Sequence, residues 1–466
     1  MASSKKYGIN TRAIHTKTRV KLATGDVMPP LHLSTTFENT QPGEYEYFYG
    51  RSGNPTRELF ERTMASLEGV ENYDEMHSFA MASGMAAVTL IGELVKPGEN
   101  VVITQDVYGG TTSFFSNIAT KRGVEVNFCD LDDLDKLNSL LNDKTKLLWF
   151  ESPSNPRIKL FDYEKYAEIA HKNSTLLVTD ATFSTPFITR PLELGADIVF
   201  HSTTKYIGGH SDSLGGVVTT NKKEVWEELH SYQKTSGAIM SPFDAYLCQR
   251  GLYTVGVRLE VHSKNAHKIA EYLETSKHIK EVFYPGLKSN PNYSIAEKQM
   301  AMFGGMLSFN VEDHIDLKKF WESLELFKLA VSLGGVESLI ELPRLMTHDN
   351  AEGTDAEIAD GLKNLTSVTK IFGDILSYMR LFALGLASAS LALTFNDLAQ
   401  QVYSSVSGLG LLFSILIMVL GHGLNLLLCL MSGVVHGLRL NFIEFYNWSV
   451  SDEGYPFKSF SKNGEI

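Results

Sequence analysis

The sequence predicts an α/β fold in which a mostly parallel β-sheet is covered by helices. Between residues about 70 and 345, short apolar runs alternate with helix-like segments, such as "DYEKYAEIAHKN" at 162–173. Continuous apolar strands that alternate with helices are typical of a parallel sheet buried on both faces. The runs are "NVVIT" at 100–104, "KLLWFES" at 146–152, "TLLVTDATF" at 175–183, "DIVFHST" at 197–203 and "GGVVTT" at 215–220.

Polar residues lie at the carboxyl ends of these runs, which is the edge where ligands gather in parallel α/β sheets. Tyr108 follows the first run, Asn155 follows the second and Asp180 lies in the third. A single polar residue after a strand is usually part of a turn or a cap, but four strand ends that meet at one edge indicate a site. The fourth run contributes Ser202, Thr204 and Lys205.

Lys205 and Asp180 suggest a specific chemistry. A lysine between glycines is usually a surface residue, but Lys205 follows a buried strand in "HSTTKYIGGHSDSLGG". Desolvation there would lower its pKa and make the amine nucleophilic toward an aldehyde. Asp180 follows apolar residues and needs a cationic partner or strong hydrogen bonds. A pyridinium nitrogen would supply that charge, and this pairing of lysine and aspartate is the one found in pyridoxal-phosphate enzymes.

A phosphate seat is possible in "MASGMAAVTLIGEL". Ser83, Gly84 and Met85 begin a predicted helix, whose free backbone amides and dipole attract anions. Taken alone, this motif is better explained as an ordinary helix cap.

Residues about 1–348 resemble the pyridoxal-phosphate (PLP) enzymes of cysteine and methionine metabolism, which include cystathionine γ-lyase, cystathionine γ-synthase and methionine γ-lyase. The resemblance implies an aspartate-aminotransferase-like fold, with an N-terminal arm at 1–60, a PLP-binding large domain at 61–250 and a truncated small domain at 251–348. The matching motifs are "YGRSGNPTR", "ASGMAA", "DVYGGT", "ESPSNP", "TDATFSTP", "HSTTKYIGGHSD", "SPFDAYLCQRGL" and "SLGGVESLIELP".

The resemblance also implies roles for individual residues. Lys205 would carry the cofactor and later move protons, Asp180 would keep the pyridine nitrogen protonated, and Tyr108 would stack on the ring. Asn155 would contact the ring hydroxyl. The phosphate would be bound by Ser83, Gly84, Met85, Ser202 and Thr204.

Two implied roles involve other molecules. Tyr49 and Arg51 would reach the phosphate in a neighbouring subunit, so a homodimer or homotetramer is expected. Ser332 lies where the family contacts the carboxylate of a small sulfur amino acid. No metal is expected.

The substrate stays open. Cystathionine lyases tend to carry glutamates at the positions of Phe48 and Val331, whereas methionine γ-lyases are apolar there but typically have a cysteine in place of Gly110. The usual asparagine after the aspartate is here Ala181. The shared chemistry would be removal of the α-proton, followed by elimination or replacement at the β or γ carbon of cystathionine, methionine or a homoserine ester.

The C-terminal part has a different composition. From Val402 to Leu438 only His422 and His436 can carry charge, over more than the about 20 residues that cross a bilayer. Residues 366–466 resemble the C-terminal end of the membrane subunit (a or I) of V-type ATPases, through "FGDILSYMRLFALGLA" and "VVHGLRLNFIEFY". The resemblance implies a hairpin of two transmembrane helices that contacts a membrane and a rotor ring.

Two arginines are the candidates for ion translocation in that part. Arg380 would face the carboxylates of the rotor ring and Arg439 would lie in the half-channel, although Arg439 could equally extend to the membrane surface. Arg380 also echoes the R-L-S-x-G arginine with which the enzyme family binds the substrate carboxylate. Its apolar surroundings favour the membrane role, so the enzyme half lacks that arginine. His422 and His436 are interpreted as packing or hydrogen-bonding residues.

The polar stretch at 349–365 is interpreted as a linker at the point where two truncated genes were fused, or as the join of an erroneous gene model. Three functions follow: a PLP-dependent carbon–sulfur lyase tethered to a membrane, a proton-transport component with a passenger enzyme, or an inactive scaffold. Turnover by the lyase is uncertain without the carboxylate arginine.

Bulk properties set the remaining limits. The net charge of the 466 residues is −12, which argues against nucleic acid as a partner. The three cysteines lie far apart, as is typical of a reducing compartment, and the start has no apolar core of a signal peptide. The enzyme half is therefore expected in the cytoplasm and the whole chain at a membrane.

Overall fold

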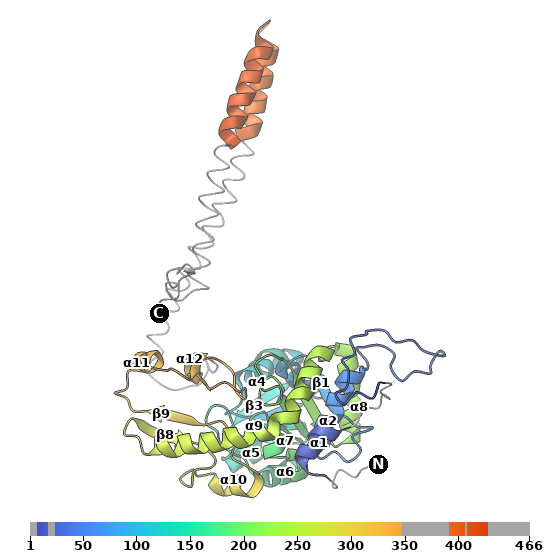
Figure 1. Cartoon of the computed structure of the whole chain (residues 1–466), viewed down its shortest axis with the longest axis vertical. Coiled ribbons are helices and arrows are strands. Elements are labelled where there is room, and N and C mark those ends of the chain that lie inside the picture. Colours follow the sequence, from blue (N-terminus) through green and yellow to red (C-terminus); the bar gives the residue numbers. More distant parts are fainter. Residues whose placement is uncertain (1–6, 17–23, 347–390, 406–407, 427–466) are drawn as a thin grey trace, which may run out of the picture. The chain divides into compact units, whose positions relative to one another are not determined.

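The computed structural model describes residues 7–16, 24–346, 391–405 and 408–426 (Figure 1). Contacts within the chain divide it into two compact units, Met1–Ala351 and Glu352–Ile466. The expected linker at 349–365 lies outside the described residues, as do Arg380, Arg439 and His436. The roles expected for these residues therefore stay predictions.

The first unit is built on a seven-stranded sheet with the order β1-β7-β6-β5-β4-β2-β3. β7 pairs antiparallel with β1 and β6, and the other described pairs in this sheet are parallel. The predicted α/β fold with a mostly parallel sheet is confirmed. The strands are β1 (Phe79–Met81), β2 (Asn100–Thr104), β3 (Glu125–Cys129), β4 (Thr145–Glu151), β5 (Leu176–Asp180), β6 (Ile198–Ser202) and β7 (Gly216–Thr220).

The sheet is buried on both faces, as its apolar strands require. Alternate residues of one strand belong to different core clusters: Val101 and Trp149 pack in one cluster, whereas Val102 and Phe150 pack in another. Because successive side chains of a strand point to opposite faces, the two clusters are the two faces of the sheet. Burial on both sides explains why the strands are continuous apolar runs rather than alternating ones.

Helices surround this sheet and begin at recognisable caps. The Asn54 side chain accepts hydrogen bonds from the backbone of Thr56 and Arg57, and Pro55 takes the first helical position of α2. The helices of this part are α1 (Ile9–His15), α2 (Pro55–Leu67), α3 (Gly84–Gly92), α4 (Gly109–Phe114), α5 (Leu134–Leu140), α6 (Tyr163–Lys172), α7 (Thr185–Ile188) and α8 (Lys223–Ser236), with the short turns η2 (Phe115–Ala119), η3 (Thr120–Arg122) and η4 (Pro191–Leu194).

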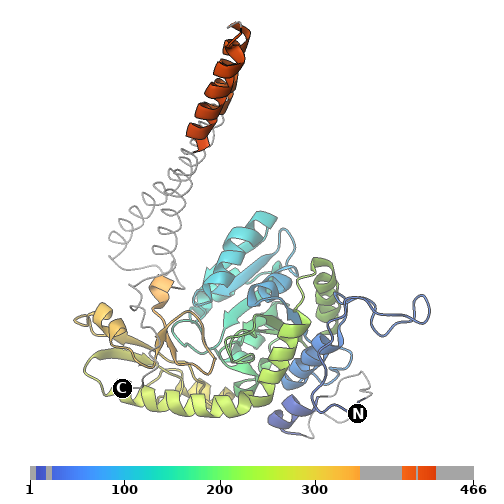
Figure 2. The same ribbon diagram turned by 45° about the horizontal axis from the view of Figure 1, so that its top comes forward.

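The 33-residue helix α9 (Pro242–Glu274) leads from the large sheet to the smaller C-terminal part of this unit (Figure 2). The expected domain border at residue 250 lies inside this helix. The smaller part contains an antiparallel pair, β8 and β9, and a parallel pair, β10 and β11. Its elements are β8 (Ile279–Phe283), α10 (Tyr293–Gln299), β9 (Ser308–Val311), α11 (Leu317–Glu322), β10 (Lys328–Leu329), β11 (Leu339–Ile340) and α12 (Pro343–Met346).

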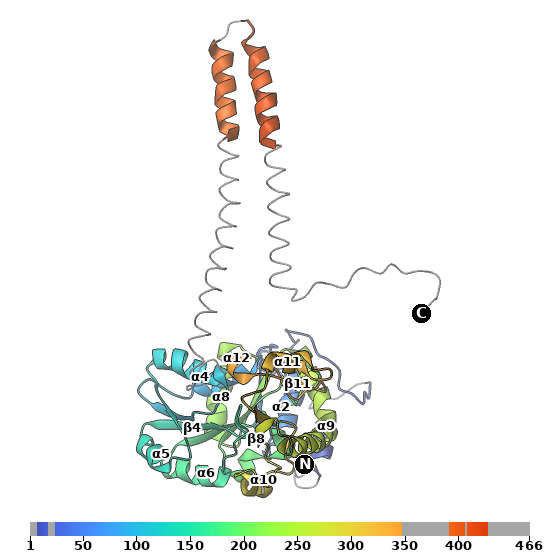
Figure 3. The same cartoon turned by 90° about the vertical axis from the view of Figure 1, so that its left-hand side faces the viewer.

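The described residues of the second unit form two helices side by side, at 391–405 and 410–426 (Figure 3). Gly408, with a φ of +84°, lies in the turn before the second helix. Asn396 and His422 are joined across the pair by a hydrogen bond of 2.8 Å, which confirms the hydrogen-bonding interpretation of His422. In the described parts of the chain, no helix is both long and apolar enough to span a membrane. The expected transmembrane hairpin is therefore not confirmed.

Candidate active site

The predicted site residues gather at the carboxyl ends of β4, β5 and β6. Asp180 is the last residue of β5, and Glu151, the last residue of β4, is its register partner. Lys205 follows β6 in a tight turn, in which its N–H donates to Ser202 O and its carbonyl accepts from Gly209 N. This is the edge that the sequence pattern indicated.

The amine of Lys205 is held at this edge by a residue from the smaller C-terminal part. Its Nζ donates a hydrogen bond of 3.2 Å to Ser332 Oγ. Burial lowers the pKa of Lys205, while the negative charges of Glu341 and Asp180 act in the opposite direction. A lysine with a lowered pKa releases its proton more readily and is a better nucleophile at neutral pH. The structure thus brings together Lys205 and Ser332, which are 127 residues apart.

Asp180 is buried beside this lysine. Burial raises the pKa of Asp180 to about 6, against the hydrogen bonds from Thr182 and the positive charges of His201 and Lys205. The Thr182 N–H donates to Asp180 Oδ1 at 2.9 Å, and the Thr182 hydroxyl accepts from Ser202 N at 2.8 Å. A further cation at Asp180 would offset its desolvation. Thr182 was missed by the sequence prediction, although it lies inside the motif "TDATFSTP".

Glu151 is a second carboxyl group that the sequence prediction missed. Its Oε2 accepts the N–H of Tyr108 at 2.9 Å. Burial raises the pKa of Glu151 well above its ordinary value, the negative charge of Asp180 raises it further, and the bond from Tyr108 opposes the shift. The available signal was positional: Glu151 ends an apolar run just as Asp180 does.

A buried histidine lies behind Asp180. His201 Nδ1 is 3.0 Å from the carbonyl oxygen of Ala181, and its Nε2 is 2.5 Å from Glu68 Oε1. A carbonyl oxygen only accepts, so Nδ1 must carry a proton. The same imidazole therefore contacts both Ala181 and Glu68 inside the core. Its electrostatic effect on Asp180 opposes the rise in the pKa of that carboxyl group.

The start of α3 forms a close-packed cradle. Ser83 caps the helix by accepting a hydrogen bond of 3.0 Å from Ala86 N. A Cβ atom at Gly84 would lie 3.1 Å from Ser202 Oγ, so a larger residue would press on Ser202. The Thr204 hydroxyl donates to the carbonyl of Gly215 at 3.3 Å and accepts its N–H at 3.2 Å. Ser202 and Gly84 thus lie next to each other, whereas the Thr204 hydroxyl is engaged with the backbone. Their expected role at a phosphate stays a prediction.

Tyr108 and its surroundings remain accessible. The Tyr108 side chain is 42% exposed and lies directly before α4. A Cβ atom at Gly110 would approach the Tyr108 ring to 2.5 Å and Met85 Sδ to 2.7 Å, so Gly110 gives the ring its room. Asn155 lies in the loop after β4, between the cis peptide bonds Ser152–Pro153 and Asn155–Pro156.

Tyr49 and Arg51 lie on the N-terminal arm and interact elsewhere. Arg51 donates to the carbonyl of Lys234 at 2.7 Å and lies 6.0 Å from the centre of the Tyr49 ring. The buried Arg57 holds this arm by donating to the carbonyls of Gly50, at 2.9 Å, and Arg51, at 3.2 Å. Within the described part of this chain, no recorded interaction joins Tyr49 or Arg51 to Lys205 or Asp180.

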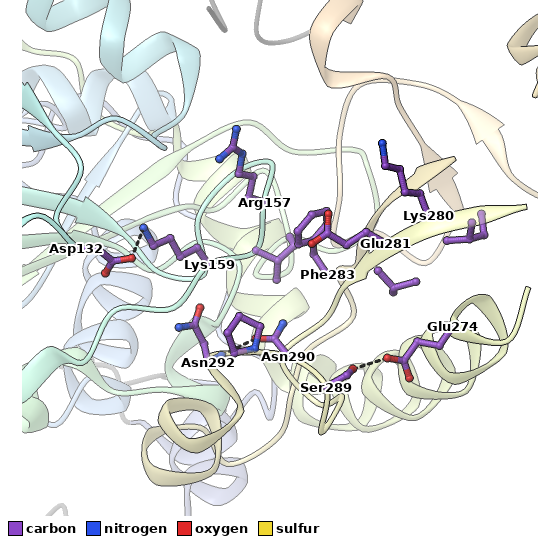
Figure 4. Close-up of a pocket in the computed structure, with 14 residues that line it drawn as sticks. Asp132, Arg157, Lys159, Glu274, Lys280, Glu281, Phe283, Ser289, Asn290 and Asn292 are labelled. Carbon is purple, nitrogen blue, oxygen red and sulfur yellow. Dashed lines mark hydrogen bonds and ion pairs between the residues drawn. The ribbon is translucent and has the colours of Figure 1, made fainter. Parts of the chain in front are cut away.

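A separate cleft of about 490 Å³ lies between the loop after Asn155 and strand β8 (Figure 4). Lys159 pairs with Asp132 on one wall, and Ser289 donates to Glu274 on another. None of the predicted site residues lines this cleft. This cleft is therefore not the candidate active site, which is instead identified by the convergence of buried carboxyl and amine groups.

The chain is similar to known proteins of one enzyme family. The model of the Cys/Met metabolism PLP-dependent enzyme family matches residues 10–368, and the chain belongs to this family. It is 44% identical over 375 residues to a cystathionine beta-lyase of Lactococcus lactis, which covers 79% of this chain and 97% of that protein. It is 43% identical over 383 residues to a cystathionine gamma-lyase of Dictyostelium discoideum, covering 81% of this chain and 98% of that protein.

Solved structures show the same fold. The chain superimposes on metB of Corynebacterium glutamicum with a TM-score of 0.72 and 42% sequence identity, covering 75% of this chain and 91% of that one. The PLP-dependent aminotransferase-like fold is thereby supported. The family match continues past the expected border at residue 348 and ends at 368, before Arg380.

Proposed function

We propose that the chain is a PLP-dependent carbon–sulfur lyase that acts on a small sulfur amino acid. The observation that carries this proposal is the contact between Lys205 Nζ and Ser332 Oγ beside the buried Asp180. Relatives named cystathionine beta-lyase and cystathionine gamma-lyase support the same class of reaction.

The residues present fit the cofactor. Asp180 is a buried carboxyl group that a pyridinium nitrogen would compensate, and Gly84 leaves the N-terminus of α3 free of side-chain bulk for a phosphate. When bound, PLP supplies an electron sink for a carbanion at the substrate α-carbon. The remaining contacts would come from Tyr108 on the ring, Asn155 on its hydroxyl, and Ser83, Met85, Ser202 and Thr204 at the phosphate.

The chain's own residues then perform the proton transfers. Lys205 Nζ, with its pKa lowered by burial, is the base that takes up the substrate α-proton and later returns a proton to the product. Ser332 orients this amine and faces the substrate carboxylate. Glu341 contributes a negative charge that limits how far the pKa of Lys205 falls.

The test uses the purified full chain. Loading with PLP, reduction with borohydride and peptide mapping should place the cofactor on Lys205, and Lys205→Ala should remove both the label and the visible absorbance. Cystathionine, methionine and O-acetylhomoserine are then compared as substrates. A labelled peptide that lacks Lys205 would contradict the assignment, and a chain that takes up no PLP would favour the scaffold function.

We also propose that Tyr49 and Arg51 complete the site of a neighbouring copy. Their described interactions lie on the arm and on Lys234, and Tyr49 is 42% exposed, so both side chains are available to a second chain. Mixing Lys205→Ala chains with Arg51→Ala chains should restore lyase activity that neither variant has alone. Absence of restored activity in verified mixed oligomers would argue for sites that each use one chain.

A separate proposal concerns residues 366–466, for which we propose attachment to a membrane and descent from a V-type ATPase membrane subunit. The observation that favours it is the exposed apolar surface of the helix at 410–426, where Leu412 and Val419 are each 65% exposed. Carbonate-resistant membrane association of the full chain supports the attachment. Co-purification with a rotor ring and loss of proton flux in Arg380→Ala would be needed for transport.

A further inference from the structure

Glu151 is a buried carboxyl group at the site for which the roles given above have no task. We propose that Glu151 retains its proton, positions Tyr108 in this neutral form, and leaves the negative charge of the carboxyl pair on Asp180. This inference deepens the proposed function and rests on it, because Asp180 is assigned there to the cofactor nitrogen.

The two carboxyl groups are forced together by the sheet. Glu151 and Asp180 are register partners on the neighbouring parallel strands β4 and β5, so their side chains leave the same face of the sheet. Glu151 is 2% exposed and Asp180 is 6% exposed. Two carboxylates that share a dry site cannot both ionise readily, and one of them keeps a proton.

The surroundings of Asp180 favour its charged form. It accepts the N–H of Thr182 and a hydrogen bond from the Thr182 hydroxyl, and the positive charges of His201 and Lys205 face it. Hydrogen-bond donors and cations both stabilise a carboxylate. Asp180 is therefore the member of the pair that carries the charge.

The surroundings of Glu151 favour its neutral form. The charged groups that face it are Asp180 from β5 and Asp106 from the loop after β2, and both are acidic. The N–H of Tyr108, from the segment before α4, is the recorded donor to its carboxyl group. With two negative neighbours and one neutral donor, Glu151 is the member that holds the proton.

The neutral carboxyl group still performs a task, because a protonated acid keeps an oxygen that accepts. Glu151 Oε2 fixes the Tyr108 N–H at 2.9 Å, while the Tyr108 carbonyl accepts from Thr111 N at 2.9 Å and Thr112 N at 3.2 Å. The backbone of Tyr108 is thus held on both sides. Its ring, which is 42% exposed, depends on this backbone for its position.

The experiment compares three variants of the full chain. Glu151→Gln keeps an oxygen acceptor but cannot be a carboxylic acid, and Glu151→Ala removes both properties. Asp106→Asn removes one negative charge that acts on Glu151 and leaves Glu151 itself unchanged. The first readout is the infrared C=O stretch of a protonated carboxyl group in the cofactor-free protein at neutral pH. We expect this band in the wild type and in Asp106→Asn, and we expect its loss in Glu151→Gln.

The second readout is the dissociation constant of PLP, measured by equilibrium dialysis. Glu151→Gln should bind within about threefold of the wild type, whereas Glu151→Ala should bind about tenfold more weakly, because a buried N–H loses its acceptor. Circular dichroism shows whether Glu151→Ala is folded; if it is not, the infrared comparison and the affinity of Glu151→Gln still decide.

The inference is overturned by a wild type without the infrared band, or by a folded Glu151→Ala that binds PLP as the wild type does. Equal weakening in Glu151→Gln and Glu151→Ala would also contradict it, because the carboxylate and not its acceptor oxygen would then matter. Failure of the proposed function has a different signature. In that case the wild type takes up no PLP, although the infrared band of Glu151 is present.

Discussion

Large apolar side chains are placed in opposite ways in the two units. In the unit Met1–Ala351, Trp149 and Phe150 are fully buried between the sheet and its helices. In the described helices of the unit Glu352–Ile466, Leu412 is 65% exposed and Phe413 is 43% exposed. The first unit therefore supplies its own apolar environment, whereas the described helices of the second unit leave large apolar side chains exposed.

Charged groups differ in the same way. The first unit buries Asp180, Glu151, His201 and Glu68 near one another, and each has recorded hydrogen bonds. In residues 391–405 and 408–426, Asp397 is the single Asp, Glu, Lys or Arg. A unit that can bury charges in compensated groups can build a catalytic site, and the described helices of the second unit contain no comparable group.

The largest effect is expected when a core residue of the first unit is truncated. Trp149→Ala should lower the free energy of unfolding by about 3–5 kcal/mol, because it leaves a cavity between Phe115 and Phe200. The matched change Phe413→Ala, in the second unit, should alter the free energy of unfolding of the first unit by less than about 0.5 kcal/mol. Urea unfolding followed by circular dichroism measures both.

A similar loss from both variants would show that the comparison is wrong and that the two units share a core. Trp149→Phe is the control for size. It keeps an aromatic ring and removes an indole N–H that has no recorded partner among the described residues, so its cost should be smaller than that of Trp149→Ala.

A second prediction uses the pH dependence of the first unit. Burial raises the pKa of Asp180 from 3.8 to about 6, so the folded cofactor-free protein binds more protons than the unfolded chain between these values. The contribution of Asp180 to the free energy of unfolding is therefore fully present below about pH 4. It falls by roughly 1–3 kcal/mol as pH rises through 6. Asp180→Asn should have a shallower decline in melting temperature over this range.

Addition of PLP supplies the control for this prediction. A cation beside Asp180 stabilises its charged form. The melting temperature of the wild type with PLP should therefore decline less steeply with pH, as that of Asp180→Asn does without PLP. The assignment fails if wild type and Asp180→Asn have identical pH profiles in the absence of the cofactor.

Several features of this unit could be predicted because they depend on local sequence. Asp180 and Lys205 follow apolar strand runs, and the carboxyl ends of parallel strands share an edge whatever the rest of the fold does. The antiparallel direction of β7 was not predicted, although the connection from Ser202 to Gly216 contains no helix that could make a parallel crossover. Strand direction is set by this connection and not by the composition of the strand.

Other features could not be read from the sequence because they depend on tertiary contacts. Glu151 ends an apolar run, which is a local signal, but its pairing with Asp180 comes from the register of β4 with β5. The contact of Lys205 with Ser332 likewise depends on how the smaller part folds back onto the large sheet. Motif resemblance assigned a role to Ser332 but none to Glu151 and His201, although these begin the motifs "ESPSNP" and "HSTTKYIGGHSD". It gave no indication of Glu68.

The smallest effect is expected in the second unit, at the hydrogen bond between His422 and Asn396. A double-mutant cycle with His422→Leu and Asn396→Leu should give a coupling of about 0.5–1 kcal/mol, measured by hydrogen exchange in the helix 391–405. The value is small because both side chains can find other partners when the helices separate. A coupling near zero would mean that the apolar contacts, such as Phe395 against Gly421, hold the pair alone. A coupling of several kcal/mol would instead require that this hydrogen bond be buried between the helices. The two units would then no longer differ in whether they bury polar groups.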